Sequence, residues 1–147
     1  MTAPPADPFR YDVFISYRHQ EPVKTWVREV LERRLADDGL RVCIDYRSFR
    51  LGVPLVLAMA EAVEQSRYTL AVLSPAYLDG NFTELENVLA EHLGLERSQR
   101  RLLAVKREPC DPPLRMRARL WLDMLDDGEL DVQLDRLVQE LRRDPGA

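Results

Sequence analysis

The sequence lacks the features that mark several specialised classes of protein. Only two cysteines occur in 147 residues, too few for a disulfide framework. Acidic residues (25) outnumber basic ones (21), and the net charge of -4 excludes an overall positive field that would attract nucleic acid or anionic lipid. The longest apolar runs are too short to span a bilayer, and the N-terminus lacks the charged start and apolar core of a secretion signal. We therefore expect a cytoplasmic protein in a reducing compartment, with no direct nucleic-acid or membrane partner.

Motifs for several familiar chemistries are also missing. The sequence has no Walker-type phosphate loop, no Gly-x-Gly-x-x-Gly fingerprint and no Gly-x-Ser-x-Gly elbow. His19 and His92 are isolated, without cysteine or carboxylate neighbours at metal-ligand spacing, so no metal site is expected. A phospho-receiver domain needs an aspartate at the end of its third strand, where Leu73-Ser74 stands instead. These absences exclude the commonest phosphate-binding, metal-binding and esterase classes.

What remains is an ordinary globular composition, with 46% hydrophobic and 31% charged residues. Strand-like and helix-like segments alternate from residue 10 onward, which requires right-handed crossovers and a parallel sheet. The predicted fold is α/β, a flavodoxin-like doubly wound five-stranded parallel sheet with helices on both faces. Strands are expected at 11–17, 40–45, 68–73, 102–105 and 120–122, with helices over 22–37, 55–66, 82–97 and 130–141. Residues 1–9 are predicted to be a flexible lead-in, 10–143 the domain, and 144–147 a tail or linker.

In such sheets, ligands bind at the carboxyl ends of the strands where the strand order reverses, here between the first and third strands. The first strand ends at Tyr17-Arg18, and the segment after the third strand carries Phe82, Glu84 and Glu86. Aromatic rings, a guanidinium and carboxylates together suit a ligand with flat bases, ribose hydroxyls and phosphates. Alternatively, Tyr17 could be only the last packed residue of a strand, and Arg18 a solvated charge.

The acidic residues after the third strand also have a purely structural interpretation. Thr83 and Glu86 have the spacing of a capping box, in which the threonine caps the helix and the glutamate reaches back to the backbone. If Asn81 is the cap instead, Glu84 completes the box and Glu86 is free. Taken alone, the spacing favours a capping role for Glu86.

Three stretches resemble the signature motifs of the Toll/interleukin-1 receptor (TIR) domain family. Residues 11–17 (Tyr-Asp-Val-Phe-Ile-Ser-Tyr) resemble its first box, and residues 45–52 (Asp-Tyr-Arg-Ser-Phe-Arg-Leu-Gly) its second. Residues 74–78 (Ser-Pro-Ala-Tyr-Leu), followed by Phe82 and Glu86, resemble its Ser-x-x-Tyr stretch and its aromatic-x-x-x-Glu pattern. The resemblance covers about residues 10–142, and it is closer to bacterial TIR domains than to animal receptors.

The resemblance carries an expectation about chemistry. Some TIR domains only assemble with others, whereas the second kind cleaves NAD+ at the nicotinamide–ribose bond with a glutamate at the start of the third helix. That position corresponds to Glu86, the expected catalytic residue, and the aromatic residue that packs against the ligand corresponds to Phe82. Tyr17 is expected to stack on a flat ring as well, while Arg18 and Arg47 face phosphate or carboxamide.

The second box adds substrate-binding candidates and a mode of regulation. Ser48 and Phe49 lie in its loop, residues 46–55, through which a neighbouring protomer often completes the site in enzymatic relatives. The resemblance therefore implies self-association, NAD+ as substrate with no other cofactor, and a sensor domain or partner outside this chain. The expected products are nicotinamide and ADP-ribose or a cyclic isomer, in bacterial anti-phage defence.

Two other functions remain open at this point. The first is a non-catalytic adaptor that acts through the second-box loop, with Glu86 as a helix cap. The second is a nucleotide-binding module that does not cleave its ligand.

Overall fold

The computed structural model describes residues 8–113 and 121–145. Within these ranges, the side chains of Tyr46, Arg47, Leu95, Gln99 and Arg100 are not described. Most of the predicted lead-in, part of the predicted tail and the first residue of the predicted fifth strand therefore lie outside the described residues. None of the helices in the described ranges combines the length and the hydrophobicity that a bilayer crossing needs.

An all-parallel sheet of five strands forms the centre of the molecule, in the order β2-β1-β3-β4-β5. The strands are β1 (Tyr11–Ser16), β2 (Val42–Cys43), β3 (Ser66–Leu73), β4 (Leu102–Lys106) and β5 (Leu122–Asp123). This order confirms the flavodoxin-like prediction. It also places the reversal of strand order between β1 and β3, at the centre of the sheet.

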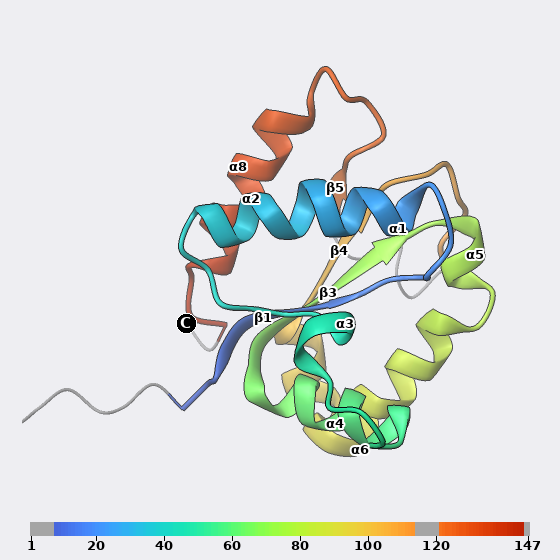
Figure 1. Ribbon diagram of the computed structural model, residues 1–147, viewed down its shortest axis with the longest axis vertical. Helices are drawn as coiled ribbons and strands as arrows, with labels where there is room; N and C mark the ends of the chain where they lie inside the picture. Colours follow the sequence, from blue (N-terminus) through green and yellow to red (C-terminus); the bar gives the residue numbers. More distant parts are fainter. Residues whose placement is uncertain (1–7, 114–120, 146–147) are drawn as a thin grey trace, which may run out of the picture.

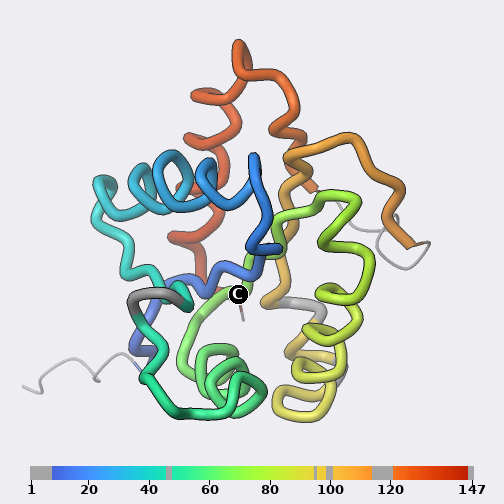
Figure 2. Tube along the Cα trace, turned by 45° about the vertical axis from the view of Figure 1, so that its right-hand side comes forward, coloured from blue at the N-terminus to red at the C-terminus, as the bar shows by residue number. Residues whose placement is uncertain are grey.

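Helices cover both faces of the sheet, as Figures 1 and 2 show from two directions. One face carries α1 (Val23–Trp26), the π-helical η1 (Val27–Leu31), α2 (Glu32–Asp37) and α8 (Leu130–Leu141). The other face carries α4 (Leu55–Gln65), α5 (Pro75–Leu78) and α6 (Asn81–Arg101). A single helical turn, α3 (Asp45–Ser48), follows β2.

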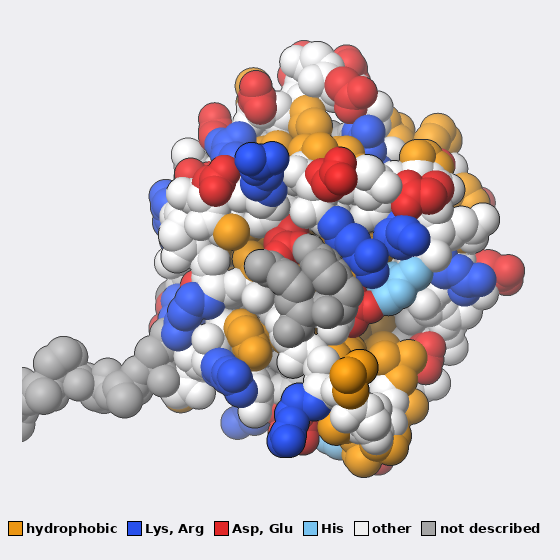
Figure 3. All heavy atoms as spheres, viewed as in Figure 1, with side chains coloured by type: hydrophobic (Ala, Val, Ile, Leu, Met, Phe, Trp, Pro, Cys, Tyr) orange, Lys and Arg blue, Asp and Glu red, His pale blue; other side chains and the backbone are white. Residues whose placement is uncertain are grey.

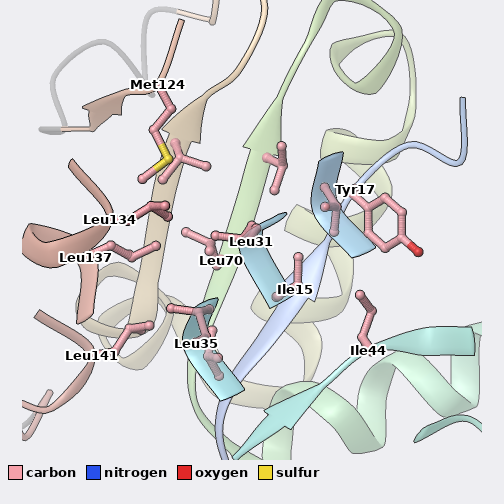
Figure 4. Packing of buried hydrophobic residues seen from close by; sticks show 14 of the residues in the cluster. Ile15, Tyr17, Leu31, Leu35, Ile44, Leu70, Met124, Leu134, Leu137 and Leu141 are labelled. Atoms are coloured by element: carbon pink, nitrogen blue, oxygen red, sulfur yellow. The ribbon is translucent and has the colours of Figure 1, made fainter. Parts of the chain in front are cut away.

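Alternation along the strands divides the core into two layers. In β1, Val13 and Ile15 face α1, η1 and α2, whereas Phe14 between them faces α4 and α6. Figure 4 shows the first layer, where Leu31 and Leu35 lie against Ile15 and Leu70. Strand β3 is buried on both faces of the sheet, which explains why its sequence is nearly continuously apolar.

The segment after β2 differs from the prediction. The sequence predicts a strand over 40–45 and a loop after it, but strand pairing ends at Cys43 and a helical turn begins at Asp45. The Ser48 side chain stabilises this turn, because its Oγ accepts a hydrogen bond from the Ile44 N–H at 3.1 Å. The Ser48 N–H returns a bond to the Ile44 carbonyl at 2.8 Å. The local hydrogen bond to the Ser48 side chain thus competes with strand pairing for the backbone N–H of Ile44.

Helix α6 also departs from the expected capping. Its N-cap is Gly80, in a left-handed conformation with φ of 128°, and no side chain caps the helix. The Glu84 N–H donates to the Gly80 carbonyl at 3.1 Å. Both capping-box interpretations, Thr83 with Glu86 and Asn81 with Glu84, are therefore wrong, and both glutamate side chains are released from that role.

Arg101 anchors the amino edge of the sheet. Its guanidinium is buried and donates to the carbonyls of Arg67 and Val63, each at 3.0 Å, and to that of Ser66. The Val63 carbonyl lies in the last turn of α4, where carbonyl groups have no hydrogen-bond donor within their own helix. The Phe9 ring lies 4.9 Å from the Arg101 guanidinium carbon, so one side chain connects α4, β3 and the N-terminal segment.

Replacing Leu70 by alanine tests the packing of the central strand. Leu70 is fully buried in β3, so we expect the free energy of unfolding to fall by about 2–5 kcal/mol. Urea unfolding of Leu70→Ala and of the wild-type protein measures this loss. Leu57→Ala is the control, because Leu57 is 56% exposed on α4 and its truncation should cost much less. Equal losses for the two variants would contradict the described core.

Candidate functional site

A pocket of about 270 Å³ opens at the carboxyl edge of the sheet, beside the reversal of strand order. We call it the switch-point pocket. It is enclosed by the end of β1 with the residues after it, by α3, by the start of α4 and by the first turn of α6. Its lining residues are Phe14, Ile15, Ser16, Tyr17, Arg18, His19, Asp45, Phe49, Leu55, Met59, Asn81 and Glu84. The site therefore lies where the fold class predicts it.

One wall of the pocket is organised by Asp45, the first residue of α3. Its Oδ1 accepts a hydrogen bond from the Tyr17 hydroxyl at 3.0 Å, and its Oδ2 lies 2.5 Å from His19 Nε2. Arg28 of η1 donates through Nε to the same Tyr17 hydroxyl at 2.9 Å. The Tyr17 and His19 rings are also in contact, with centroids 4.6 Å apart. This network fixes the segment after β2 against the end of β1.

The protonation of this wall follows from its burial. Burial raises the pKa of Tyr17 to about 12, and the Asp45 charge acts in the same direction, against the hydrogen bond from Arg28. Tyr17 is therefore a neutral donor to Asp45 at physiological pH. Burial lowers the pKa of His19, and the nearby charges of Arg28 and Lys24 add to this, while Asp45 opposes it. Figure 3 shows a histidine among basic side chains on the face viewed in Figure 1.

The opposite wall is the first turn of α6. Arg18, which follows β1, donates through one terminal nitrogen to Asn81 Oδ1 at 3.0 Å. Glu84, one turn further along the helix, also lines the pocket. A guanidinium and a carboxylate thus lie at the same opening, as the sequence analysis expected for the two segments.

Phe82 does not present its ring to this pocket, contrary to the expectation that it packs against a ligand. Its side chain is only 2% exposed, and its ring centroid lies 6.2 Å from that of Tyr77. The physical reason is the core-facing side of α6, where Leu85 and Leu89 are buried with Phe82 against the sheet.

Glu86 is half-buried and is not among the residues that line the pocket. Its negative charge acts on Tyr77, where it adds to the effect of burial in raising the pKa of the hydroxyl. That hydroxyl is hydrogen-bonded to Ser16 Oγ at 2.9 Å, and Ser16 lines the pocket. The Ser74 hydroxyl accepts a bond from the Tyr77 N–H at 3.2 Å. The Ser-x-x-Tyr stretch therefore connects Glu86 to the pocket wall.

The second-box residues divide between two hollows. Phe49 lines the switch-point pocket and also an adjacent hollow of about 120 Å³, whereas Ser48 lines only the latter. The Arg47 side chain lies outside the described part of the chain. Within the described residues, no group of three or more His, Cys, Asp or Glu side chains is arranged to hold a metal ion.

Sequence reasoning missed several residues of the site. His19 is isolated in the sequence, yet it pairs with Asp45, which is 26 positions away. Asp45 itself could have been found, since it opens the second-box stretch directly after a strand. Arg28 and Asn81 had no such signal, because their roles depend on how η1 and α6 meet the end of β1.

A model of the family described as TIR domain matches residues 13–138. The chain belongs to the TIR domain family. Among curated relatives, the chain is 27% identical over 100 residues to Toll-like receptor 6 of Mus musculus, covering 68% of this chain and 12% of the receptor. It is 36% identical over 73 residues to the probable 2′ cyclic ADP-D-ribose synthase BdTIR of Brachypodium distachyon, covering 50% of this chain and 32% of that protein.

A third relative is the NAD(+) hydrolase TcpA of Theionarchaea archaeon, which is 33% identical over 87 residues, or 58% of this chain and 26% of that protein. The TIR chain thus spans about a third or less of the length of these relatives. Among solved structures, the TIR domain of the Toll-related receptor TRR-2 from Hydra magnipapillata gives a TM-score of 0.75 at 23% identity. The match covers 90% of this chain and 99% of that one, and it supports the fold.

The buried phenol of Tyr17 should make stability fall at alkaline pH. Above pH 10 the unfolded chain releases the Tyr17 proton that the native state retains up to about pH 12, so the unfolded state binds fewer protons and stability decreases as pH rises. Tyr17→Phe should flatten the decline by about 1 kcal/mol between pH 10 and pH 11. Urea unfolding of both proteins at pH 9, 10 and 11 measures the slopes. Identical slopes would contradict the raised pKa.

Proposed function

We propose that this TIR domain cleaves NAD+ at the nicotinamide–ribosyl bond, giving nicotinamide and ADP-ribose or a cyclic ADP-ribose isomer. The observation that carries the proposal is the switch-point pocket, in which Arg18, Phe49 and Glu84 line one hollow at the carboxyl edge of the sheet. The names of two relatives, a cyclic ADP-D-ribose synthase and an NAD(+) hydrolase, support this substrate.

Cleavage of this bond requires few catalytic groups from the protein. Nicotinamide in NAD+ is already a cationic leaving group, so the breaking C–N bond returns its electron pair to the ring nitrogen and no general acid is needed. Positive charge then develops on the ribose, where a fixed carboxylate stabilises it. Water that captures the ribosyl carbon loses its proton and gives ADP-ribose. Capture by a nucleophile of the same ligand gives a cyclic product.

The size of the pocket suggests which part of the dinucleotide it takes. A volume of about 270 Å³ is slightly below the range of about 300–1,000 Å³ for pockets that enclose a small molecule. We assign it to the nicotinamide–ribose end, with the pyrophosphate directed toward Arg18 at the rim and the rest of the ligand outside. A second protomer would then complete the site around the exposed part of NAD+.

On the resemblance to enzymatic TIR domains, we propose that Glu86 is the catalytic carboxylate. Its charge acts on the Tyr77 hydroxyl, which is one hydrogen bond from Ser16 on the pocket wall. The low dielectric of the buried surroundings strengthens this electrostatic effect of Glu86 on Tyr77.

The wider role that we propose is a bacterial anti-phage effector. A sensor domain or partner would drive its assembly, and the assembled effector would deplete NAD+.

Glu86→Ala should lower NAD+ turnover about 100-fold, the usual cost of removing one group that stabilises transition-state charge. The measurement is chromatography of NAD+ incubated with concentrated protein. Circular dichroism melting of the variant checks that its fold is retained. Equal turnover by Glu86→Ala and the wild-type protein would remove Glu86 from the mechanism but leave the pocket as the site.

A second candidate function, a non-catalytic assembly module, is favoured by an exposed apolar cluster. It consists of Leu51 in the second-box loop and of Leu55, Val56 and Leu57 at the start of α4. Leu51 is fully exposed and the other three are more than half exposed. Figure 3 shows hydrophobic side chains gathered over the lower part of the molecule, near α4. Contact between copies through this cluster would serve either function.

Leu51→Asp should weaken self-association, because a charge in an apolar contact must be desolvated when the contact forms. We expect light scattering to give a lower mean mass for this variant at high concentration, and NAD+ cleavage to fall in parallel. Val132→Asp is the matched control, since Val132 is 62% exposed but lies on α8, on the opposite face of the sheet. If mass falls and cleavage does not, assembly is not what activates the enzyme.

A further inference from the structure

One helical run, from α1 through η1 to α2, contains a π-helical turn in its middle. Buried residues recur at every fourth position of this run, at Val23, Val27, Leu31 and Leu35. In a regular α-helix, each step of four residues advances about 40° beyond a full turn, so such positions would drift away from the sheet. A π-helical turn takes up more residues than an α-helical turn, and η1 therefore keeps Leu31 and Leu35 against the sheet (Figure 4).

The same π-helical turn carries Arg28 beside the end of β1. Arg28 is half-buried, and its Nε donates to the Tyr17 hydroxyl at 2.9 Å. Its guanidinium carbon also lies 5.9 Å from the centre of the Tyr17 ring. Tyr17 lines the switch-point pocket, whereas Arg28 is not among the lining residues. Arg28 can therefore act on the pocket through Tyr17.

The two hydrogen bonds of the Tyr17 hydroxyl have one consistent direction. A guanidinium only donates hydrogen bonds, and an ionised carboxylate only accepts them. The phenol oxygen therefore accepts the bond from Arg28, and its proton is directed to Asp45 Oδ1, 3.0 Å away. The Tyr17 side chain is only 5% exposed, and in such surroundings consecutive hydrogen bonds polarise and strengthen one another.

Asp45 connects this chain of hydrogen bonds to the second-box wall of the pocket. It is the first residue of α3, and its backbone carbonyl accepts a hydrogen bond from the Phe49 N–H at 3.0 Å. Phe49 lines the switch-point pocket. A continuous path of hydrogen bonds thus runs from Arg28 through Tyr17 and Asp45 to Phe49. The contact between Asp45 and His19 is a second tether of α3, but the His19 side chain is 49% exposed.

We propose that Arg28 is a positioning residue of the switch-point pocket. It directs the Tyr17 hydroxyl to Asp45, and so holds α3, and with it Phe49, in the place where the substrate binds. The inference deepens the proposed cleavage of NAD+, and its kinetic part rests on that function. Glu86 belongs to α6, which forms the opposite wall. Loss of Arg28 should therefore weaken substrate binding and leave the bond-breaking step unchanged.

Steady-state kinetics of NAD+ cleavage by the concentrated protein test the path from Arg28 to α3. Arg28→Met keeps a long side chain but removes the donor. KM should rise about tenfold, as for loss of one hydrogen bond to a charged group, with kcat within about twofold of wild type. Tyr17→Phe should raise KM similarly, and the double variant should have the KM of Tyr17→Phe alone, because Arg28 acts through that hydroxyl. Additive increases in KM, or a fall in kcat at unchanged KM, would overturn the inference.

Hydrogen–deuterium exchange followed by mass spectrometry tests the same inference without catalysis. The N–H groups of Ser48 and Phe49 are hydrogen-bonded within the α3 segment, so their exchange reports the opening of α3. In Arg28→Met these amides should exchange about tenfold faster, in step with the rise in KM. Arg33→Met is the matched control, because Arg33 is exposed on α2, in the same helical run, and lies outside the pocket. Its exchange and its KM should equal those of the wild-type protein.

The exchange of β3 separates a local effect from a general loss of stability. Its amides should exchange at the wild-type rate in Arg28→Met, and equal acceleration in α3 and β3 would overturn the inference. If Arg28→Met does not fold, Tyr17→Phe provides the same comparison. Wild-type exchange in α3, or a wild-type KM, would overturn the inference and leave the proposed function intact. If the assembled wild-type protein cleaves no NAD+, the proposed function fails, and exchange alone decides whether Arg28 holds α3.

Discussion

The hydrogen bond between Ser16 and Tyr77 is the interaction on which the arrangement of the site depends. It joins the end of β1 to α5 inside the core, and the Tyr77 ring in turn supports Phe82 at the start of α6. Because Tyr77 is fully buried, loss of the Ser16 hydroxyl would leave the Tyr77 hydroxyl buried and unsatisfied. This contact, the Tyr77–Phe82 ring pair and the bond from Arg18 to Asn81 together connect the end of β1 to the start of α6.

The two walls of the pocket are built on different physical terms. The α6 wall rests mainly on the buried apolar packing of Phe82, Leu85 and Leu89, with one exposed bond from Arg18 to Asn81 at the first turn. The α3 wall rests on Asp45 and its bonds to Tyr17 and His19, and the His19 side chain is 49% exposed. Charged and partly solvated contacts of this kind are screened by salt and respond to protonation. Changes in solution conditions should therefore move the second-box side of the pocket before they move the helix that carries the glutamates.

Much of the fold could be predicted from the sequence because local patterns and global topology agree. The apolar run of β3 indicated a central strand, and alternating segments indicated the parallel sheet. The short α3 turn was missed because it depends on a bond to the Ser48 hydroxyl, which competes with strand pairing. The site was only partly predictable. The topology predicts that the segments of Arg18 and Glu84 meet at one edge of the sheet, and both residues line the pocket. The burial of Phe82 follows from the packing of α6 on the sheet, which no motif encodes.

The guanidinium of Arg101 gives the opposite edge of the sheet a different character. One planar cation satisfies three carbonyls that converge from α4 and β3, and it carries an aromatic ring on one side. A lysine could not replace it, because a single ammonium group cannot match that fork of acceptors. These contacts hold the amino edge of the sheet together independently of the pocket at the carboxyl edge. Substitutions among the pocket residues would therefore leave the Arg101 contacts in place.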